Sequence, residues 1–72
     1  MNERLERLIQ GLARRKTEVH PSQRLNEDLG LDSLKLIRLA VMVYNEFGVD
    51  LGELAEKGAR FEKVEDILRH LA

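Results

Sequence analysis

Apolar residues recur every three or four positions in three stretches of this sequence, a spacing that places them along one face of an α-helix. The pattern predicts helices over residues 2–15 and 33–47, and a last helix of roughly ten residues that begins near Val64. A short third helix fits residues 52–57. These segments predict an all-α fold, a small four-helix bundle with three main helices and a short third one.

Residue types that favour helix ends mark the boundaries of the second helix. Asp32 stands directly before it and is a suitable N-cap, because its carboxylate can accept a hydrogen bond from a free N–H group of the first turn. Gly48 follows the last expected helical residue and can adopt the left-handed conformation that ends many helices. In the first helix, basic residues 14–16 fall in the expected last turn, where the helix dipole favours positive charge.

The helical spacing is absent from residues 17–32, and Pro21 excludes a continuous helix through them. Gly30 offers a turn before the second helix. We therefore expect a long ordered loop between the first and second helices, and long loops in small domains are usually functional. Four apolar residues are spaced so that they can pin this loop onto the bundle: Val19, Leu25, Leu29 and Leu31.

The 72 residues make one domain, residues 1–72, with no room for a separate enzyme cleft. They include no cysteine, so helix packing must stabilise the core without disulfides or thiolate metal ligands. No apolar run is long enough for a membrane span, and the N-terminus lacks a signal peptide, which favours a cytoplasmic location. A net charge of −1 predicts no broad basic face for nucleic acid.

Residues 28–34, Asp-Leu-Gly-Leu-Asp-Ser-Leu, place a serine in the first turn of a helix directly after a glycine-containing loop. The geometry exposes the Ser33 hydroxyl, and the free N–H groups and positive dipole at a helix start favour an anionic phosphate on it. The alternative is that Asp32 and Ser33 only cap the helix. Neither His20 nor His70 lies near Ser33 in the sequence, so no catalytic base for this serine is indicated.

The sequence around this serine resembles that of the acyl carrier and peptidyl carrier proteins, the family of phosphopantetheine-attachment domains. The family pattern is Leu-Gly-x-Asp-Ser-Leu, followed by a helix that ends in Glu-x-Phe or Glu-Phe. Here those residues are 29–34 and Glu46-Phe47. Further similarities are Ser22-x-x-Leu25 in the loop, Asp50 soon after the second helix, and Val64-Glu65-Asp66 at the start of the last helix. The resemblance covers essentially all 72 residues.

The resemblance implies that a phosphopantetheinyl transferase attaches 4′-phosphopantetheine from coenzyme A to Ser33. The terminal thiol of that arm then holds an acyl or aminoacyl group as a thioester, at high effective concentration for successive enzymes. The chain would be a stand-alone, monomeric carrier and not an enzyme, with no metal. Its partners would be the transferase, an acyl- or aminoacyl-loading ligase and downstream biosynthetic enzymes.

The second helix is expected to divide into a core face and a surface that partner enzymes contact. The core candidates are Leu36, Ile37, Ala40, Val43, Tyr44 and Phe47. The candidates for partner recognition are Asp32, Leu34, Lys35, Arg38, Val41 and Met42. Leu34 follows the modified serine, and its counterpart in the family commonly contacts partners. The alternative for Val41 and Met42 is ordinary surface exposure, because small bundles always leave some apolar atoms outside.

The second helix departs from the carriers of fatty acid synthesis, in which it is typically acidic. Lys35 and Arg38 make it basic near Ser33, so we expect a specialised carrier with neutral or acidic partners, in a lipid, polyketide, nonribosomal peptide or aminoacyl pathway. The alternatives are a housekeeping acyl carrier of fatty acid synthesis and an unmodified helical protein-interaction module. A helix-turn-helix DNA binder is disfavoured, because the acidic residues of the preceding loop would repel phosphates.

Overall fold

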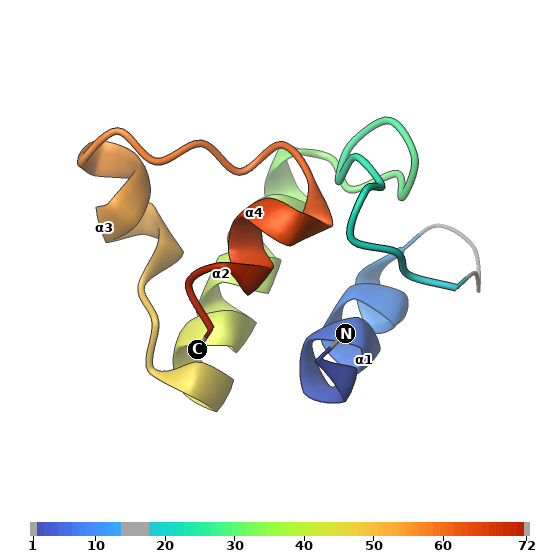
Figure 1. The fold of residues 1–72 in the computed structure, drawn as a ribbon, viewed down its shortest axis with the longest axis horizontal. Helices are drawn as coiled ribbons and strands as arrows, with labels where there is room; N and C mark the ends of the chain where they lie inside the picture. Colours follow the sequence, from blue (N-terminus) through green and yellow to red (C-terminus); the bar gives the residue numbers. More distant parts are fainter. Residues whose placement is uncertain (1, 14–17, 72) are drawn as a thin grey trace.

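The computed structural model describes residues 2–13 and 18–71, which contain four helices and no strand (Figure 1). In chain order the helices are α1 (Glu3–Leu12), α2 (Ser33–Phe47), α3 (Leu51–Glu56) and α4 (Val64–Leu68). In the view of Figure 1, α1 and α3 lie on either side of α2, and α2 packs against both. The prediction of an all-α fold with a long connection between the first two helices is confirmed.

The predicted bounds of α2 are confirmed, and both of its caps have the expected geometry. The Oδ1 atom of Asp32 accepts a hydrogen bond from the N–H of Lys35 at 2.9 Å. At the other end Gly48 has φ 72°, in the left-handed region, and its N–H donates to the carbonyl oxygen of Tyr44 at 2.8 Å. A glycine ends the helix here because other residues rarely adopt this backbone conformation.

The other three helices differ from their predicted extent, α3 by one residue at each end and α1 and α4 more strongly at their C-terminal ends. α1 ends at Leu12, because Ala13 already has an extended backbone conformation. The rest of the predicted extension, with basic residues 14–16, lies outside the described residues. α4 has five residues instead of roughly ten, since the chain tightens into a turn, in which the N–H of His70 donates to the carbonyl oxygen of Ile67 at 3.0 Å.

The third helix begins at Leu51, one residue earlier than the sequence predicts. Asp50 is its N-cap, with a carboxylate oxygen that accepts a hydrogen bond from the N–H of Glu53 at 3.0 Å. The predicted helix start is one residue late because the spacing of apolar residues takes no account of this cap.

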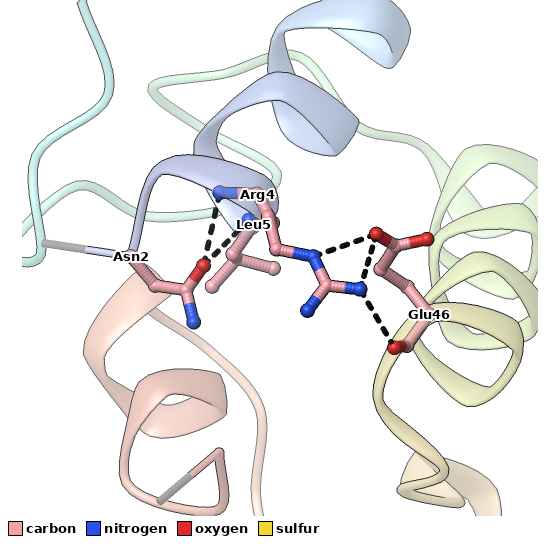
Figure 2. Close-up of polar contacts among 4 residues, drawn as sticks. All are labelled: Asn2, Arg4, Leu5 and Glu46. Carbon is pink, nitrogen blue, oxygen red and sulfur yellow. Dashed lines mark hydrogen bonds and ion pairs between the residues drawn. The ribbon is translucent and has the colours of Figure 1, made fainter.

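Arg4 joins α1 to the end of α2 (Figure 2). Its Nε donates to Oε1 of Glu46 at 2.7 Å, and its Nη2 donates to the carbonyl oxygen of the same residue at 3.2 Å. The guanidinium carbon lies 5.1 Å from the centre of the Phe47 ring. Asn2 begins α1, since its Oδ1 accepts the N–H groups of Arg4 and Leu5 at 2.9 and 3.1 Å. α1 therefore lies on the side of α2 that carries Glu46.

The core is built from apolar side chains of all four helices and the long loop. Its buried members are Leu5, Ile9, Val19, Leu25, Leu29, Leu31, Leu39, Val43, Leu51, Val64 and Ile67. All four loop residues that the sequence predicts to pin the loop are among them, so that prediction is confirmed. Within the described residues, no polar or charged residue is buried.

Backbone hydrogen bonds also fasten the long loop to the start of α4. The N–H of Leu25 donates to the carbonyl oxygen of Glu62 at 2.9 Å, and the N–H of Val64 donates back to that of Gln23 at 3.0 Å. The N–H of Glu65 donates to the carbonyl oxygen of Pro21 at 2.9 Å. The loop that leads to Ser33 is therefore held by a segment 37 to 44 residues further along the chain.

The predicted core face of α2 is partly wrong. Ile37 and Tyr44, both expected in the core, expose 62% and 55% of their surface, whereas Leu39 is buried. The cause is the position of α1. Because α1 packs on the Glu46 side of α2, the buried face of α2 includes Leu39 and Val43. The helical pattern of α2 fits both arrangements, because apolar residues surround most of this helix.

Candidate functional site

Ser33 is the first residue of α2, and its side chain is exposed. The chain reaches it through Gly30, which has φ 69°, and through Leu31, which is buried. Two hydrogen bonds fix Leu31: its N–H donates to the carbonyl oxygen of Leu25, and the side-chain amide of Asn26 donates to its carbonyl oxygen, both at 3.0 Å. The structure thus presents the serine from a well-anchored loop, as the sequence predicts.

The helix start beside Ser33 has backbone N–H groups that donate no hydrogen bond within the described residues. Asp32 occupies the N–H of Lys35, while those of Ser33 and Leu34 have no partner in the described part of the chain. The Ser33 hydroxyl likewise makes no hydrogen bond to any described residue. A phosphodiester on this oxygen would meet two free donors and the positive end of a helix of 15 residues. These features fit a covalently attached phosphate group.

The charges around this site are unevenly paired. In the loop, Asp28 accepts the N–H of Arg24 at 2.7 Å, and Glu27 lies 3.8 Å from the Arg24 guanidinium. On α2, Lys35 is half-buried and Arg38 is exposed, and neither forms an ion pair with a described residue. Arg38 is therefore the cation near Ser33 that is most accessible to another molecule.

The predicted recognition residues fall into two groups. Asp32, Leu34, Arg38 and Val41 are exposed, whereas Lys35 and Met42 are half-buried. Ile37 and Tyr44, predicted from the sequence to lie in the core, are exposed on the same line of α2 as Ser33. Their spacing of four and eleven positions from Ser33 places them on its face of the helix, but helical spacing alone does not decide whether that face is buried.

A small apolar pocket lies beside α2, one turn after Ser33. It has a volume of about 210 Å³ and is open to solvent on one side. Its walls come from α2, α3, α4 and the two long connections: Leu25, Leu36, Ile37, Leu39, Ala40, Leu51, Gly52, Phe61 and Ile67. The sequence does not predict this pocket, because residue types alone do not show where packing leaves space.

Other kinds of site receive no support from the described residues. They contain no group of three or more His, Cys, Asp or Glu side chains placed to hold a metal ion. None of the four helices in this part of the chain has the length and apolarity needed to cross a membrane. His20 lies 3.4 Å from the Glu18 carboxylate, and His70 packs edge-on against Phe61 with ring centres 5.6 Å apart.

Comparison with known proteins gives relatives for most of the chain. An acyl carrier protein from Rickettsia bellii strain RML369-C is 33% identical over 54 residues, which is 75% of this chain and 60% of the relative. An acyl carrier protein from Solidesulfovibrio magneticus is 37% identical over 51 residues, or 71% of this chain and 63% of the relative. The alignments thus span less than two thirds of these relatives. No solved structure matches the chain.

Residues 3–55 match the protein family described as "Phosphopantetheine attachment site". The match includes α1, the long loop, α2 and most of α3, and with them Ser33 and the segment that presents it. The prosthetic group of this family is 4′-phosphopantetheine, which agrees with the exposed hydroxyl and free donors at the start of α2. The chain belongs to the phosphopantetheine attachment-site family.

Proposed function

We propose that Ser33 carries a 4′-phosphopantetheine arm and that the chain tethers an acyl group on this arm as a thioester. The observation that carries the proposal is the exposed hydroxyl on the first residue of α2, within a segment that matches the attachment-site family. The tethered group would be presented to successive enzymes at a high effective concentration. The chemistry on the cargo belongs to those enzymes.

Attachment is a phosphoryl transfer in which Ser33 is a substrate. Its Oγ attacks the phosphorus of coenzyme A that bears the pantetheine. A bond forms between serine oxygen and phosphorus, the bond between the two phosphates breaks, and adenosine 3′,5′-bisphosphate leaves. No described residue hydrogen-bonds the hydroxyl, so the transferase must accept its proton. This chain contributes an anchored loop, a capped helix start and two free N–H donors.

The apolar pocket beside α2 supports an acyl cargo over an aminoacyl cargo. Apolar side chains line it almost throughout, and an ammonium group that entered it would lose water without gaining a partner. An aliphatic chain would instead gain about 0.8 kcal/mol for each buried methylene. The enzymes that load and process this cargo, an acyl-loading ligase among them, are part of the same proposal.

The charges of α2 support a specialised acyl pathway over housekeeping fatty acid synthesis. From Ser33 to Asn45 the helix has two basic residues and no acidic one. Arg38 is exposed and unpaired among the described residues, so it would favour partners with neutral or acidic surfaces. A fatty-acid ketosynthase with a basic docking surface should then bind the loaded protein weakly, and Arg38→Glu should strengthen that binding.

The test of the attachment itself is intact mass after incubation with coenzyme A, magnesium and a permissive phosphopantetheinyl transferase. We expect the wild-type chain to gain one phosphopantetheinyl group and Ser33→Ala to gain none. Ser22→Ala is the matched control, because Ser22 is the other serine of the chain and is also exposed. An unmodified wild-type protein would contradict the proposal and support the interaction-module alternative.

A further inference from the structure

A second cavity lies between the long loop, the first turns of α2 and the connection from α3 to α4, which runs past the start of α2 (Figure 1). It has a volume of about 360 Å³ and is open to solvent. Its base is apolar and is formed by Leu25, Leu36 and Phe61. Its rim is polar and is formed by Arg24, Asn26, Glu27 and Glu62. We refer to this space as the loop cavity.

The loop cavity is adjacent both to Ser33 and to the apolar pocket. Leu36 lies three residues after Ser33 on α2, which is about 4.5 Å along the axis at 1.5 Å per residue. Leu25, Leu36 and Phe61 line both spaces and therefore form a wall between them. The Phe61 ring is packed edge-on against His70, with ring centres 5.6 Å apart. A flexible group on Ser33 can therefore reach the loop cavity within one helical turn.

The polar rim has hydrogen-bonding groups that the described part of the chain does not use. The Nδ2 atom of Asn26 donates to a backbone carbonyl at 3.0 Å, but its Oδ1 atom accepts no hydrogen bond. The backbone N–H groups of Asn26 and Glu27 donate none. The carboxylates of Glu27 and Glu62 each contact one arginine, at 3.8 and 3.9 Å respectively. Most of their capacity to accept hydrogen bonds is therefore unused.

The chemistry of a pantetheine chain complements these groups. It consists of secondary amides and a hydroxyl joined by short aliphatic segments. Its N–H groups can donate to Asn26 Oδ1 and to the two carboxylates, and its carbonyl oxygens can accept from the free backbone N–H groups. Its aliphatic segments can pack on the apolar base. The volume is sufficient, because sites for small organic ligands usually measure about 300 to 1,000 Å³.

We propose that the loop cavity is the resting site of the polar part of the arm on Ser33, which is held there by hydrogen bonds to Asn26, Glu27 and Glu62. The inference rests on the proposed function, since it requires an arm on this serine. Tethering gives the arm a high effective concentration at the cavity, so a few exposed hydrogen bonds are enough to hold it. Because the two spaces share a wall, an arm in the loop cavity would bring its acyl end to the apolar pocket.

The first experiment locates the arm without any enzyme that acts on cargo. Amide NMR spectra of the ¹⁵N-labelled chain are compared before and after loading with coenzyme A and a permissive transferase. We expect the backbone amides of Asn26, Glu27 and Glu62 and the side-chain amide of Asn26 to shift. The neighbours of Ser33 will shift in any case. The amide of Glu56 is the internal control, because this residue lines neither space.

The second experiment uses the thiol of the arm as a reporter. The chain has no cysteine, so this thiol is the only one in the loaded protein. We expect the double variant Glu27→Ala/Glu62→Ala to react with iodoacetamide about three to five times faster than the wild type, because the arm is released. Glu53→Ala/Glu56→Ala is the matched control. It makes the same change in net charge at exposed positions of α3 and should keep the wild-type rate.

The outcomes separate this inference from the proposed function. If the wild-type chain never gains the arm, the proposed function fails. If the arm is attached but the NMR shifts stop at the neighbours of Ser33, only the inference about the loop cavity is overturned. An unchanged alkylation rate in Glu27→Ala/Glu62→Ala would overturn it too. So would shifts confined to Ala40, Leu51 and Gly52, which line the apolar pocket alone, because the arm would then lie there.

Discussion

The carboxylate of Asp66 holds together the segment that enters α4. Its Oδ2 atom accepts the N–H of Lys63 at 2.8 Å and that of Glu62 at 2.9 Å, and Arg69 lies 3.4 Å from its other oxygen. The backbone hydrogen bond from Lys63 is the main reason that the pKa of Asp66 lies below its ordinary value of 3.8. Partial burial opposes this effect, while the second backbone bond and the nearby positive charges reinforce it.

These interactions of the Asp66 carboxylate make part of the free energy of unfolding depend on pH. Because the pKa of Asp66 is lower in the folded state, its carboxylate stabilises the fold fully above about pH 4. This stabilisation is lost as the pH falls through the pKa of the folded state. We expect Asp66→Ala to lower the free energy of unfolding by about 1 kcal/mol at neutral pH, and by less near pH 3. Urea denaturation at the two pH values measures this. Glu56→Gln, on the exposed face of α3, is the control, and an equal loss at both pH values for Asp66→Ala would contradict the prediction.

Two glycines provide a second test at the level of single residues. Gly48 has φ 72° and Gly11 lies within α1, and a Cβ atom at either position would meet nothing within 4 Å. Backbone conformation alone should therefore decide the effect of alanine. We expect Gly48→Ala to destabilise the protein by about 1 kcal/mol and Gly11→Ala to stabilise it by about 0.5 to 1 kcal/mol. Denaturant midpoints that shift in the same direction would rule out this explanation.

At the scale of elements, α2 shows which features the sequence predicts and which it does not. Its bounds follow from two local features, a capping aspartate and a glycine in the left-handed conformation, and both were predicted. Which face of the helix is buried depends on where α1 docks, and that contact joins residues 42 positions apart. The sequence therefore predicts the attachment serine, but not the exposure of Ile37 and Tyr44.

The pocket between α2 and α3 leads to a prediction about cargo length. A cavity of about 150 Å³ lined by apolar side chains is able to hold benzene, so the pocket of about 210 Å³ fits an aliphatic chain of roughly six to eight carbons. Once the arm is loaded, we expect the melting temperature to rise with acyl length up to about eight carbons and then to level off.

Ala40→Leu should abolish this rise, because residue 40 lines the pocket and the larger side chain fills it. Ala55→Leu, at an exposed position on α3, is the matched control and should keep the dependence on chain length. A melting temperature that is independent of chain length in the loaded wild-type protein would show that the cargo stays outside.

At the scale of the whole molecule, long-range contacts decide what the sequence does not show. Helical spacing predicts the number and order of the helices, and the buried loop residues follow from their apolar character. The shortness of α4 was not predicted, because apolar residues continue to Leu71 after the helical hydrogen bonds have given way to a turn. The pocket was not predicted because it forms where side chains of five segments fail to fill the space between them.

The hydrogen bonds between the long loop and the entrance to α4 limit how far the molecule can be shortened. The residues that match the attachment-site family end at 55, before the entrance to α4. The partners that keep Leu25, Gln23 and Pro21 in place nevertheless lie at residues 62–65. A fragment that contains only the matched residues would keep Ser33 but lose the hydrogen bonds that anchor its loop. The last quarter of the chain therefore helps to hold the attachment serine in position.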